Sequence, residues 1–366
     1  MKNKDFELWK FYGEICQGHR EIDISIFLLF ITTFSDKDIK NFFKNIDLNS
    51  LIAKMNNDIR DEIGVSLFSK IGLALFSLNY LSEYDEKLME LRDDIELRFI
   101  EHFSEAIDYI QDKEVQEKYI DYVTGISGSL YCLLTSQRVS FFKQNEIIFR
   151  SLSYLQKNIS YILTSNKNFK LGSAHGLSGI MFVLTFAYVK GYQVEGQREI
   201  IDEIWELLFS RKEVYNEVFY WQYDLVEVTT LSSRASWCVG NLGILNNLLF
   251  VAKHFSKKEY NLLCQMIYNL VKSDFIQLQY SDNSLCHGYA GYVLFLSFLK
   301  QAKKISDQFY RERLCRIQTI INSSVIDKKE GCLTVTNFIE SGLSVPLVMN
   351  TIHNGRESLY SLLGFI

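Results

Sequence analysis

The chain has 366 residues, of which 48% are hydrophobic and 23% are charged, and its formal net charge is −5 at pH 7. A nucleic-acid-binding protein would carry a basic surface, so this balance argues against that class of partner. Acidic and basic side chains are mixed without long blocks of one sign, which is typical of solvated helix faces.

The sequence favours a cytoplasmic location. Its apolar stretches are shorter than the roughly 18 to 20 residues that a membrane-spanning helix needs. The first residues, MKNKDFELWKFYGE, carry acidic side chains where a secretion signal would be apolar. We therefore expect a protein that is not integral to the membrane, and in the cytoplasm disulfides among its seven cysteines are disfavoured.

Apolar runs of helical length recur along the chain. The first is IDISIFLLFITTF from Ile22, and the second is SKIGLALFSLNYL from Ser69. Amphipathic stretches, such as YDEKLMELRDDIELRFIEHF from Tyr84, lie between such runs. A run that is apolar nearly all round predicts a helix buried on every side, whereas an amphipathic stretch predicts a helix in an outer layer. Since the only proline is Pro346, these helices are uninterrupted.

The later apolar runs share a beginning: a polar or metal-binding residue type, followed by Gly-x-x-Gly. Four clear copies are DYVTGISGSLYCLL from Asp121, AHGLSGIMFVLTFA from Ala174, CVGNLGILNNLLF from Cys238 and CHGYAGYVLFL from Cys286, and weaker ones start at Ser69 and Glu340. The marker glycines, which are 53, 51, 64, 48 and 54 residues apart, are Gly72, Gly125, Gly176, Gly240, Gly288 and Gly342. Each period holds two helices with their connections.

This repeat predicts one all-α domain over residues 1–366, an α/α toroid with about seven inner and seven outer helices. An open helical solenoid is the alternative, but no polar capping repeat stands at either end of the array. In a closed ring the glycine-rich starts of the inner helices gather at one end. Functional residues from distant parts of the sequence would meet there.

Three of the residues beside the glycines suggest a metal site. Cys238, Cys286 and His287 offer two thiols and one imidazole, and three protein ligands with one open position are the pattern of a catalytic zinc site. The spacing alone is a modest signal, because 48 residues separate the two cysteines. The remaining histidines and cysteines, which have no ligand-like neighbours, are His19, His102, His254, His353, Cys16, Cys132, Cys264, Cys315 and Cys332.

The ordered set HGxxG, RxxWCxGxxG and CHGxxG, found here at residues 175–179, 234–243 and 286–291, resembles the lanthionine synthetase C-like family of class I lanthipeptide cyclases. A DxxxGxxG at residues 121–128 also fits. The resemblance implies an α/α toroid with one Zn²⁺ per chain, held by Cys238, Cys286 and His287. It also implies cyclisation, in which a peptide cysteine adds to dehydroalanine or dehydrobutyrine and forms a thioether.

The same resemblance gives roles to further residues. His175 would be the acid/base that protonates the enolate formed by addition, which suits an imidazole. Asp121 would orient His175 or share in proton transfer, although an aspartate at this position is also a common helix cap. Arg234 would steady the enolate oxygen or hold Asp121. Trp237 would form a wall of the substrate pocket, with the protein core as the alternative.

The resemblance further implies partners. The substrate would be a dehydrated ribosomal precursor peptide with its leader. A transient complex with a dehydratase and an exporter would bring the chain to the membrane surface as a peripheral protein.

Some residues depart from the family pattern, and two other functions stay open. Val239 and Leu242 stand where family members commonly have an aromatic residue and a proline, and Val345 replaces a usual glycine. One alternative is another zinc-dependent thiol-alkylating toroid, such as a prenyltransferase subunit, but no basic cluster for a diphosphate stands out. The other is a non-catalytic toroid that binds a modified peptide or glutathione. Loss of His175 or of a metal ligand would favour it, and all are present.

Overall fold

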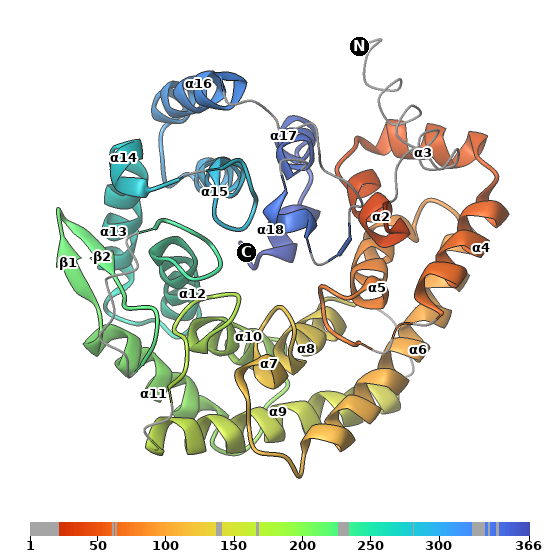
Figure 1. The fold of residues 1–366 in the computed structure, drawn as a ribbon, viewed down its shortest axis with the longest axis horizontal. Coiled ribbons are helices and arrows are strands. Elements are labelled where there is room, and N and C mark those ends of the chain that lie inside the picture. Colours follow the sequence, from red (N-terminus) through yellow and green to blue (C-terminus); the bar gives the residue numbers. More distant parts are fainter. Residues whose placement is uncertain are drawn as a thin grey trace.

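The computed structural model describes residues 22–366 except residues 61, 63, 137–140, 166–167, 226–233, 281, 324–333, 336 and 342–343. Its secondary structure is almost entirely helical, with one two-stranded hairpin. The helices form two concentric layers around a common centre (Figure 1). The prediction of an all-α toroid is confirmed.

The inner layer is built from the predicted apolar runs (Figure 1). It contains α2 (Ile24–Thr32), α5 (Lys70–Leu81), α8 (Ile126–Thr135), α10 (Leu177–Val189), α12 (Asn241–His254), α15 (Tyr289–Gln301) and α17 (Ser344–Asn354). In α10, for example, every residue from Leu177 to Thr185 is buried. The first six of these helices are buried along most of their length, as expected for helices covered on all sides, whereas α17 is only partly covered, with Pro346 and His353 exposed.

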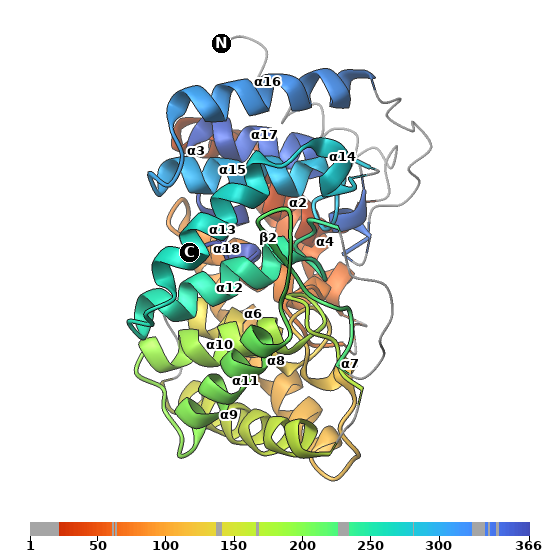
Figure 2. The same cartoon turned by 90° about the vertical axis from the view of Figure 1, so that its left-hand side faces the viewer.

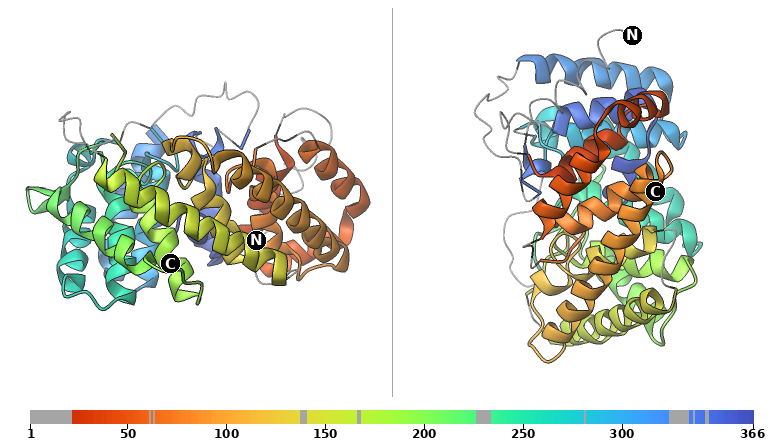
Figure 3. Two further views of the ribbon diagram at one scale, coloured as in Figure 1. Left: turned by 90° about the horizontal axis from the view of Figure 1, so that it is seen from below. Right: turned by 90° about the vertical axis from the view of Figure 1, so that its right-hand side faces the viewer.

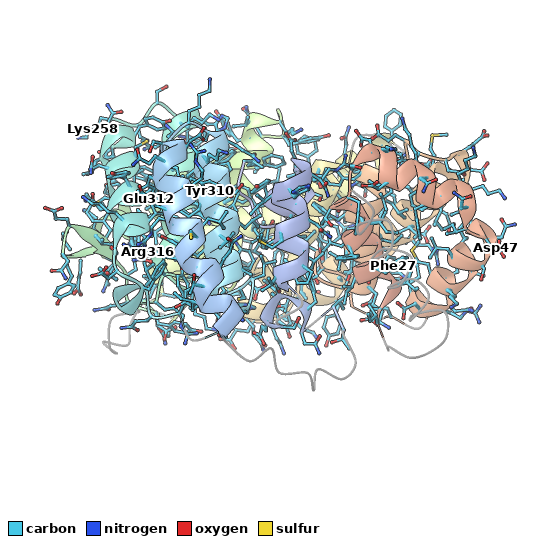
Figure 4. All side chains as sticks on the ribbon, turned by 90° about the horizontal axis from the view of Figure 1, so that it is seen from above. Phe27, Asp47, Lys258, Tyr310, Glu312 and Arg316 are labelled. Carbon is cyan, nitrogen blue, oxygen red and sulfur yellow. The ribbon has the colours of Figure 1, made fainter. Side chains whose placement is uncertain are left out.

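The outer layer is amphipathic. It contains α3 (Asp36–Asn45), α4 (Leu48–Ile59), α6 (Glu86–Ile110), α9 (Phe141–Thr164), α11 (Gln197–Ser210), α13 (Tyr260–Lys272) and α16 (Asp307–Ser323). Seen from below, α9 runs obliquely across the outside of the ring (Figure 3). Glu312 and Arg316 lie on the solvent side of α16, whereas Phe27 of α2 is buried in the core (Figure 4).

Short elements connect the two layers. They are α7 (Glu117–Ile120), α14 (Phe275–Leu278), the 3₁₀ turn η1 (Phe338–Glu340), α18 (Ser358–Leu362) and a hairpin of β1 (Glu213–Tyr215) and β2 (Val218–Tyr220). The hairpin was not predicted. Its turn residues Asn216 and Glu217 both have positive φ, and the second is not the glycine that usually marks such a turn.

The loops before the inner helices are hydrogen-bonded from each repeat to the next. The bonds run from Tyr122 N and Val123 N to Ala174 O (3.1 and 3.2 Å), from Ala174 N to Cys238 O (2.8 Å), from Trp237 N and Cys238 N to Cys286 O (3.1 and 3.4 Å), and from Leu285 N and Cys286 N to Ile339 O (both 2.9 Å). The helices α7 and α14, which precede two of these loops, lie at the same end of the ring, on the right of Figure 2. The motif loops therefore meet at one end, as predicted.

The second glycine of each Gly-x-x-Gly lets its loop fold back over the first turn of the inner helix. At Gly128, an added Cβ would collide with the carbonyl oxygen of Tyr122, six residues earlier. An added Cβ at Gly179, Gly243 or Gly291 would likewise collide with the carbonyl oxygen six residues earlier, which belongs to Ser173, Trp237 or Leu285, respectively. The recurrence of Gly-x-x-Gly thus has a steric cause, and the chemistry of each repeat depends on the residues before its first glycine.

The C-terminal segment lies at the centre of the ring (Figure 1). Its backbone carbonyls accept hydrogen bonds from inner-layer side chains: Leu362 O from Tyr122 Oη (2.9 Å), Leu363 O from Trp237 Nε1 (2.9 Å) and Gly364 O from Asn246 Nδ2 (3.0 Å). The ring closes where Arg356 Nε donates to Thr32 O (3.0 Å). None of the helices within the described ranges is long and apolar enough to cross a membrane.

Candidate metal centre and active site

Cys238, Cys286 and His287 come together at the end of the ring where the motif loops meet. One donor atom from each residue lies within 4.8 Å of the other two, and both thiols are buried. Within the described residues, no other group of three or more His, Cys, Asp or Glu donors converges in this way. The 48 residues between the cysteines are bridged by the backbone bonds from Trp237 N and Cys238 N to Cys286 O.

The repeat explains this convergence. Cys238 and Cys286 each stand two residues before the first glycine of their motif, and His287 stands directly before it. Because consecutive loops are hydrogen-bonded at this position, side chains at equivalent positions become neighbours. A spacing that is uninformative in the sequence therefore becomes a compact donor set in the fold.

The two thiols are hydrogen-bonded to each other, and their pKa values are shifted in opposite directions. The hydrogen bond from Cys286, with help from His287, holds the pKa of the Cys238 thiol well below its usual range. The resulting thiolate raises the pKa of the Cys286 thiol. A buried negative charge held in this way is ready to bind a cation.

Asp282 is a site residue that the sequence analysis missed. Its Oδ2 lies 3.1 Å from His287 Nε2, and His287 is also bonded to the Cys238 thiol, so we assign Nδ1 as the ring nitrogen on the side of the cysteines. This carboxylate, followed by Cys238, raises the pKa of His287 to about 10. Burial alone would raise the pKa of Asp282, but the bonds from His287 and Ser284 hold it well below its usual range. The available signal was a carboxylate five residues before His287 in the same loop.

This donor set fits zinc. Zinc sites in proteins use cysteine sulfur and histidine nitrogen, and catalytic sites keep three protein ligands and one open position. The second nitrogen of a ligating histidine is commonly held by a carboxylate, which fixes the ring. Asp282 holds His287 in that way.

His175 and Asp121 form a second group of functional side chains. His175 Nδ1 lies 2.8 Å from Asp121 Oδ2, and the carboxylate is buried while 35% of the His175 side chain is exposed. Asp121 Oδ1 also accepts from the backbone N–H groups of Thr124 (2.6 Å) and Gly125 (2.9 Å). The bond to Asp121 raises the pKa of His175 above its ordinary value, although burial and Lys170 oppose this.

The two groups belong to one site. Ala174 N donates to Cys238 O at 2.8 Å, so the loop that carries His175 lies directly against the loop that carries a predicted metal ligand. The Cys238 thiol adds to the electrostatic stabilisation of a protonated His175. Nε2 of His175 makes no hydrogen bond to any described residue, and it is therefore the nitrogen that can reach a substrate.

Arg234 and Trp237 differ from the expected arrangement. Within the described part of the chain, the Arg234 side chain makes no hydrogen bond or ion pair, and Asp121 is held by Thr124, Gly125 and His175 instead. Trp237 is only 1% exposed, and its Nε1 donates to Leu363 O. Its indole packs against Phe68 and Tyr122, so Trp237 belongs to the core rather than to a pocket wall.

The other histidines and cysteines lie outside this site. His254 packs against Phe250 in α12 with tilted rings at a centroid distance of 4.4 Å, and Cys132 is buried in α8. His102, His353, Cys264 and Cys315 belong to no donor cluster among the described residues. His19, Cys16 and Cys332 lie outside the described residues.

Residues 26–334 match the family model of the lanthionine synthetase C-like proteins, so the chain belongs to this family. The Nisin biosynthesis protein NisC of Lactococcus lactis subsp. lactis is 24% identical over 360 residues, an alignment that covers 88% of this chain and 82% of NisC. A solved structure of a nisin cyclase has the same fold, with a TM-score of 0.79 at 18% identity, over 100% of this chain and 98% of that one.

Proposed function

We propose that this chain is a zinc-dependent lanthipeptide cyclase. It would add the thiolates of peptide cysteines to dehydroalanine or dehydrobutyrine and so form the thioether rings of lanthionine and methyllanthionine. Family membership and the likeness to two nisin proteins support the proposal. The observation that carries it is the Cys238–Cys286–His287 donor set, with both thiols buried, beside the His175–Asp121 pair.

In this proposal Cys238, Cys286 and His287 hold one Zn²⁺. When bound, zinc supplies the Lewis acidity that converts a thiol to a thiolate near neutral pH. The chain contributes two sulfur ligands, and Asp282 keeps the His287 ring in the orientation that presents Nδ1. The burial of both cysteines excludes water from their side of the site.

His175 then moves the proton. Addition of sulfur to the β carbon of the dehydro residue leaves an enolate, and the reaction ends when the α carbon gains a proton. Since Asp121 raises the pKa of His175, the imidazolium form persists to higher pH than that of an ordinary histidine. Asp121 fixes Nδ1, so Nε2 is the atom that would deliver the proton. The proton given to carbon replaces the one that the substrate thiol lost.

The proposed substrate is a dehydrated precursor peptide with its leader, and the proposed location is the cytoplasm. A dehydratase must act first, because the acceptor double bond is its product. A transient complex with that enzyme and with an exporter would place the chain at the membrane surface as a peripheral protein.

The His175–Asp121 pair favours catalysis over the alternative of a non-catalytic module that binds a peptide or glutathione. Binding alone requires no partly exposed imidazole that has a raised pKa and whose Nε2 makes no hydrogen bond to a described residue. This pair therefore separates the two functions better than the donor set does, since a metal centre could serve either.

The test is ring formation in dehydrated precursor peptides, including that of nisin. Cyclisation leaves the peptide mass unchanged but hides thiols, so alkylation followed by mass spectrometry measures it. We expect the zinc-loaded protein to reduce the number of alkylated thiols and the chelator-treated protein to leave it unchanged. Peptides that keep all their thiols in the presence of the zinc-loaded protein would contradict the proposal.

A further inference from the structure

We infer that Lys170 is a further catalytic residue, whose ammonium group donates a hydrogen bond to the carbonyl oxygen that becomes negatively charged when sulfur adds. The inference rests on the proposed cyclase function. It concerns a residue outside the sequence motifs, five positions before His175.

The backbone around Lys170 is held from several sides. Lys170 O accepts from Leu177 N (3.0 Å) in the first turn of α10, and Leu171 N donates to Tyr223 O (3.1 Å). Lys170 also pairs with Asp224 in an isolated β-bridge. The side chain therefore starts from a fixed point relative to the His175 loop.

The ammonium group is tied to the short helix α7. Lys170 Nζ lies 3.4 Å from Glu117 Oε2 and 5.5 Å from the centre of the Tyr223 ring, and 29% of the side chain is exposed. Burial lowers the pKa of Lys170, but Glu117 and Tyr223 outweigh this and keep the group charged. An ammonium carries three N–H donors, so at least one remains for a ligand when the other two point to Glu117 and Tyr223.

Glu117 and Asp121 hold Lys170 and His175, respectively, from neighbouring positions in the chain. The two carboxylates are four residues apart, and Asp121 N donates to Glu117 O (3.0 Å), which places them on one helical turn. Glu117 holds Lys170, and Asp121 holds His175. The ammonium and the imidazole are therefore anchored to the same turn, and they lie close enough for the charge of Lys170 to lower the pKa of His175.

This neighbourhood suits the chemistry of the proposed reaction. When the S–C bond forms at the β carbon, the electron pair of the C=C bond shifts toward the carbonyl oxygen. That oxygen is two bonds from the α carbon, which His175 protonates, so a donor beside His175 can reach it. On protonation the pair forms the new C–H bond, C=O is restored, and Lys170 keeps its own proton.

Arg234 is the other cation expected near the enolate oxygen, as one of its two possible roles. Within the described residues, the Arg234 side chain makes no bond to the His175–Asp121 pair, whereas Lys170 is held by Glu117 on the turn that leads to Asp121. The test therefore compares both cations.

The first measurement is the rate of ring formation by zinc-loaded variants. Lys170→Met should lower kcat by about 10²–10³, the usual loss for one oxyanion donor, with little change in KM. Lys170→Arg should retain more activity. Lys190→Met, at the other end of α10, is the matched control and should behave like wild type. The double variant Lys170→Met/Glu117→Gln leaves no unpaired carboxylate and should show the same loss.

The second measurement needs no peptide. In the zinc-loaded protein, the pKa of His175 is read from ¹³C-labelled histidine by NMR, with His175→Asn as the assignment control. The charged groups that face His175 are Asp121, Glu117, Lys170 and the Cys238 thiolate. Lys170→Met should raise the pKa of His175, because a neighbouring cation is lost.

The outcomes separate the two proposals. A wild-type protein that forms no rings overturns the proposed function and this inference with it. An active wild type overturns this inference alone if Lys170→Met keeps full kcat, or if the loss appears in Arg234→Met instead. A loss of kcat together with a raised His175 pKa supports the inference.

Discussion

His175 and His287 occupy the same position in two copies of the repeat, with the copy that carries Cys238 between them, yet they present opposite ring nitrogens. Each stands directly before the first glycine of a Gly-x-x-Gly loop, and each has a carboxylate partner. Asp121 holds Nδ1 of His175 at 2.8 Å, which leaves Nε2 open. Asp282 holds Nε2 of His287 at 3.1 Å, which leaves Nδ1 on the side of the cysteines.

The source of the carboxylate makes the difference. Asp121 comes from the preceding repeat, whereas Asp282 comes from the same loop as its histidine. The residue before the histidine also differs, since Ala174 offers no ligand and Cys286 offers a thiol. The same loop can therefore present a histidine as a proton carrier or as a metal ligand. Its role depends on which of the two ring nitrogens the carboxylate binds.

The largest expected effect comes from removing a sulfur ligand beside His287. Cys238→Ala or Cys286→Ala should lose most of the bound zinc and all ring formation, because two donors do not form a tetrahedral site. Elemental analysis of the purified variants gives the zinc content per chain. Cys264→Ala, outside the donor set, is the control. Full zinc content in both ligand variants would place the metal elsewhere.

Asp282→Asn should weaken the metal site without abolishing it. The carboxylate only orients His287, and loss of such a partner typically costs about 10–100-fold in metal affinity. Competition with a chromogenic chelator measures the change. Asp307→Asn, an exposed position on α16, is the control. An unchanged zinc affinity would mean that Asp282 does not fix the ring.

Asp121→Asn tests the role of His175 through the pH dependence of the cyclisation rate. The Asp121 carboxylate raises the pKa of His175, so the protonated form needed for catalysis persists to higher pH in the wild type. Without that charge the pKa falls, and the alkaline limb of the rate profile should move to lower pH. Asparagine still offers Oδ1 to Thr124 N and Gly125 N, so the loop is retained. A limb that stays in place or moves to higher pH contradicts this role.

Gly128→Ala should have the smallest effect, and it acts on the scaffold that both histidines share. The added methyl group would collide with Tyr122 O, so the loop must shift at a cost of about 1–3 kcal/mol. Gly64→Ala is the matched control, since nothing lies within 4 Å of its added methyl group. We expect the melting temperature to fall only for Gly128→Ala. Equal melting temperatures would show that the loop does not need its second glycine.

The sequence allowed the toroid and the donor set to be predicted because both depend on the repeat. The apolar runs became inner helices, and the position before each glycine identified Cys238, Cys286 and His287. Asp282 and Lys170 were missed, because their roles depend on which loop faces which in three dimensions. For Trp237 the sequence left a pocket wall and the core as alternatives, and the structure buries the residue and bonds its Nε1 to Leu363 O. No motif in the sequence indicates that the C-terminal segment occupies the centre of the ring.

The central claim is that two similar histidines have separate tasks, and one experiment tests it directly. Zinc content and ring formation are measured on the same preparations of His175→Asn and His287→Ala. His175→Asn should keep about one zinc per chain while cyclisation falls by about 10²–10⁴, as for the loss of a general acid. His287→Ala should lose zinc and activity together. If His175→Asn also lost the zinc, the division of roles between the two histidines would be wrong.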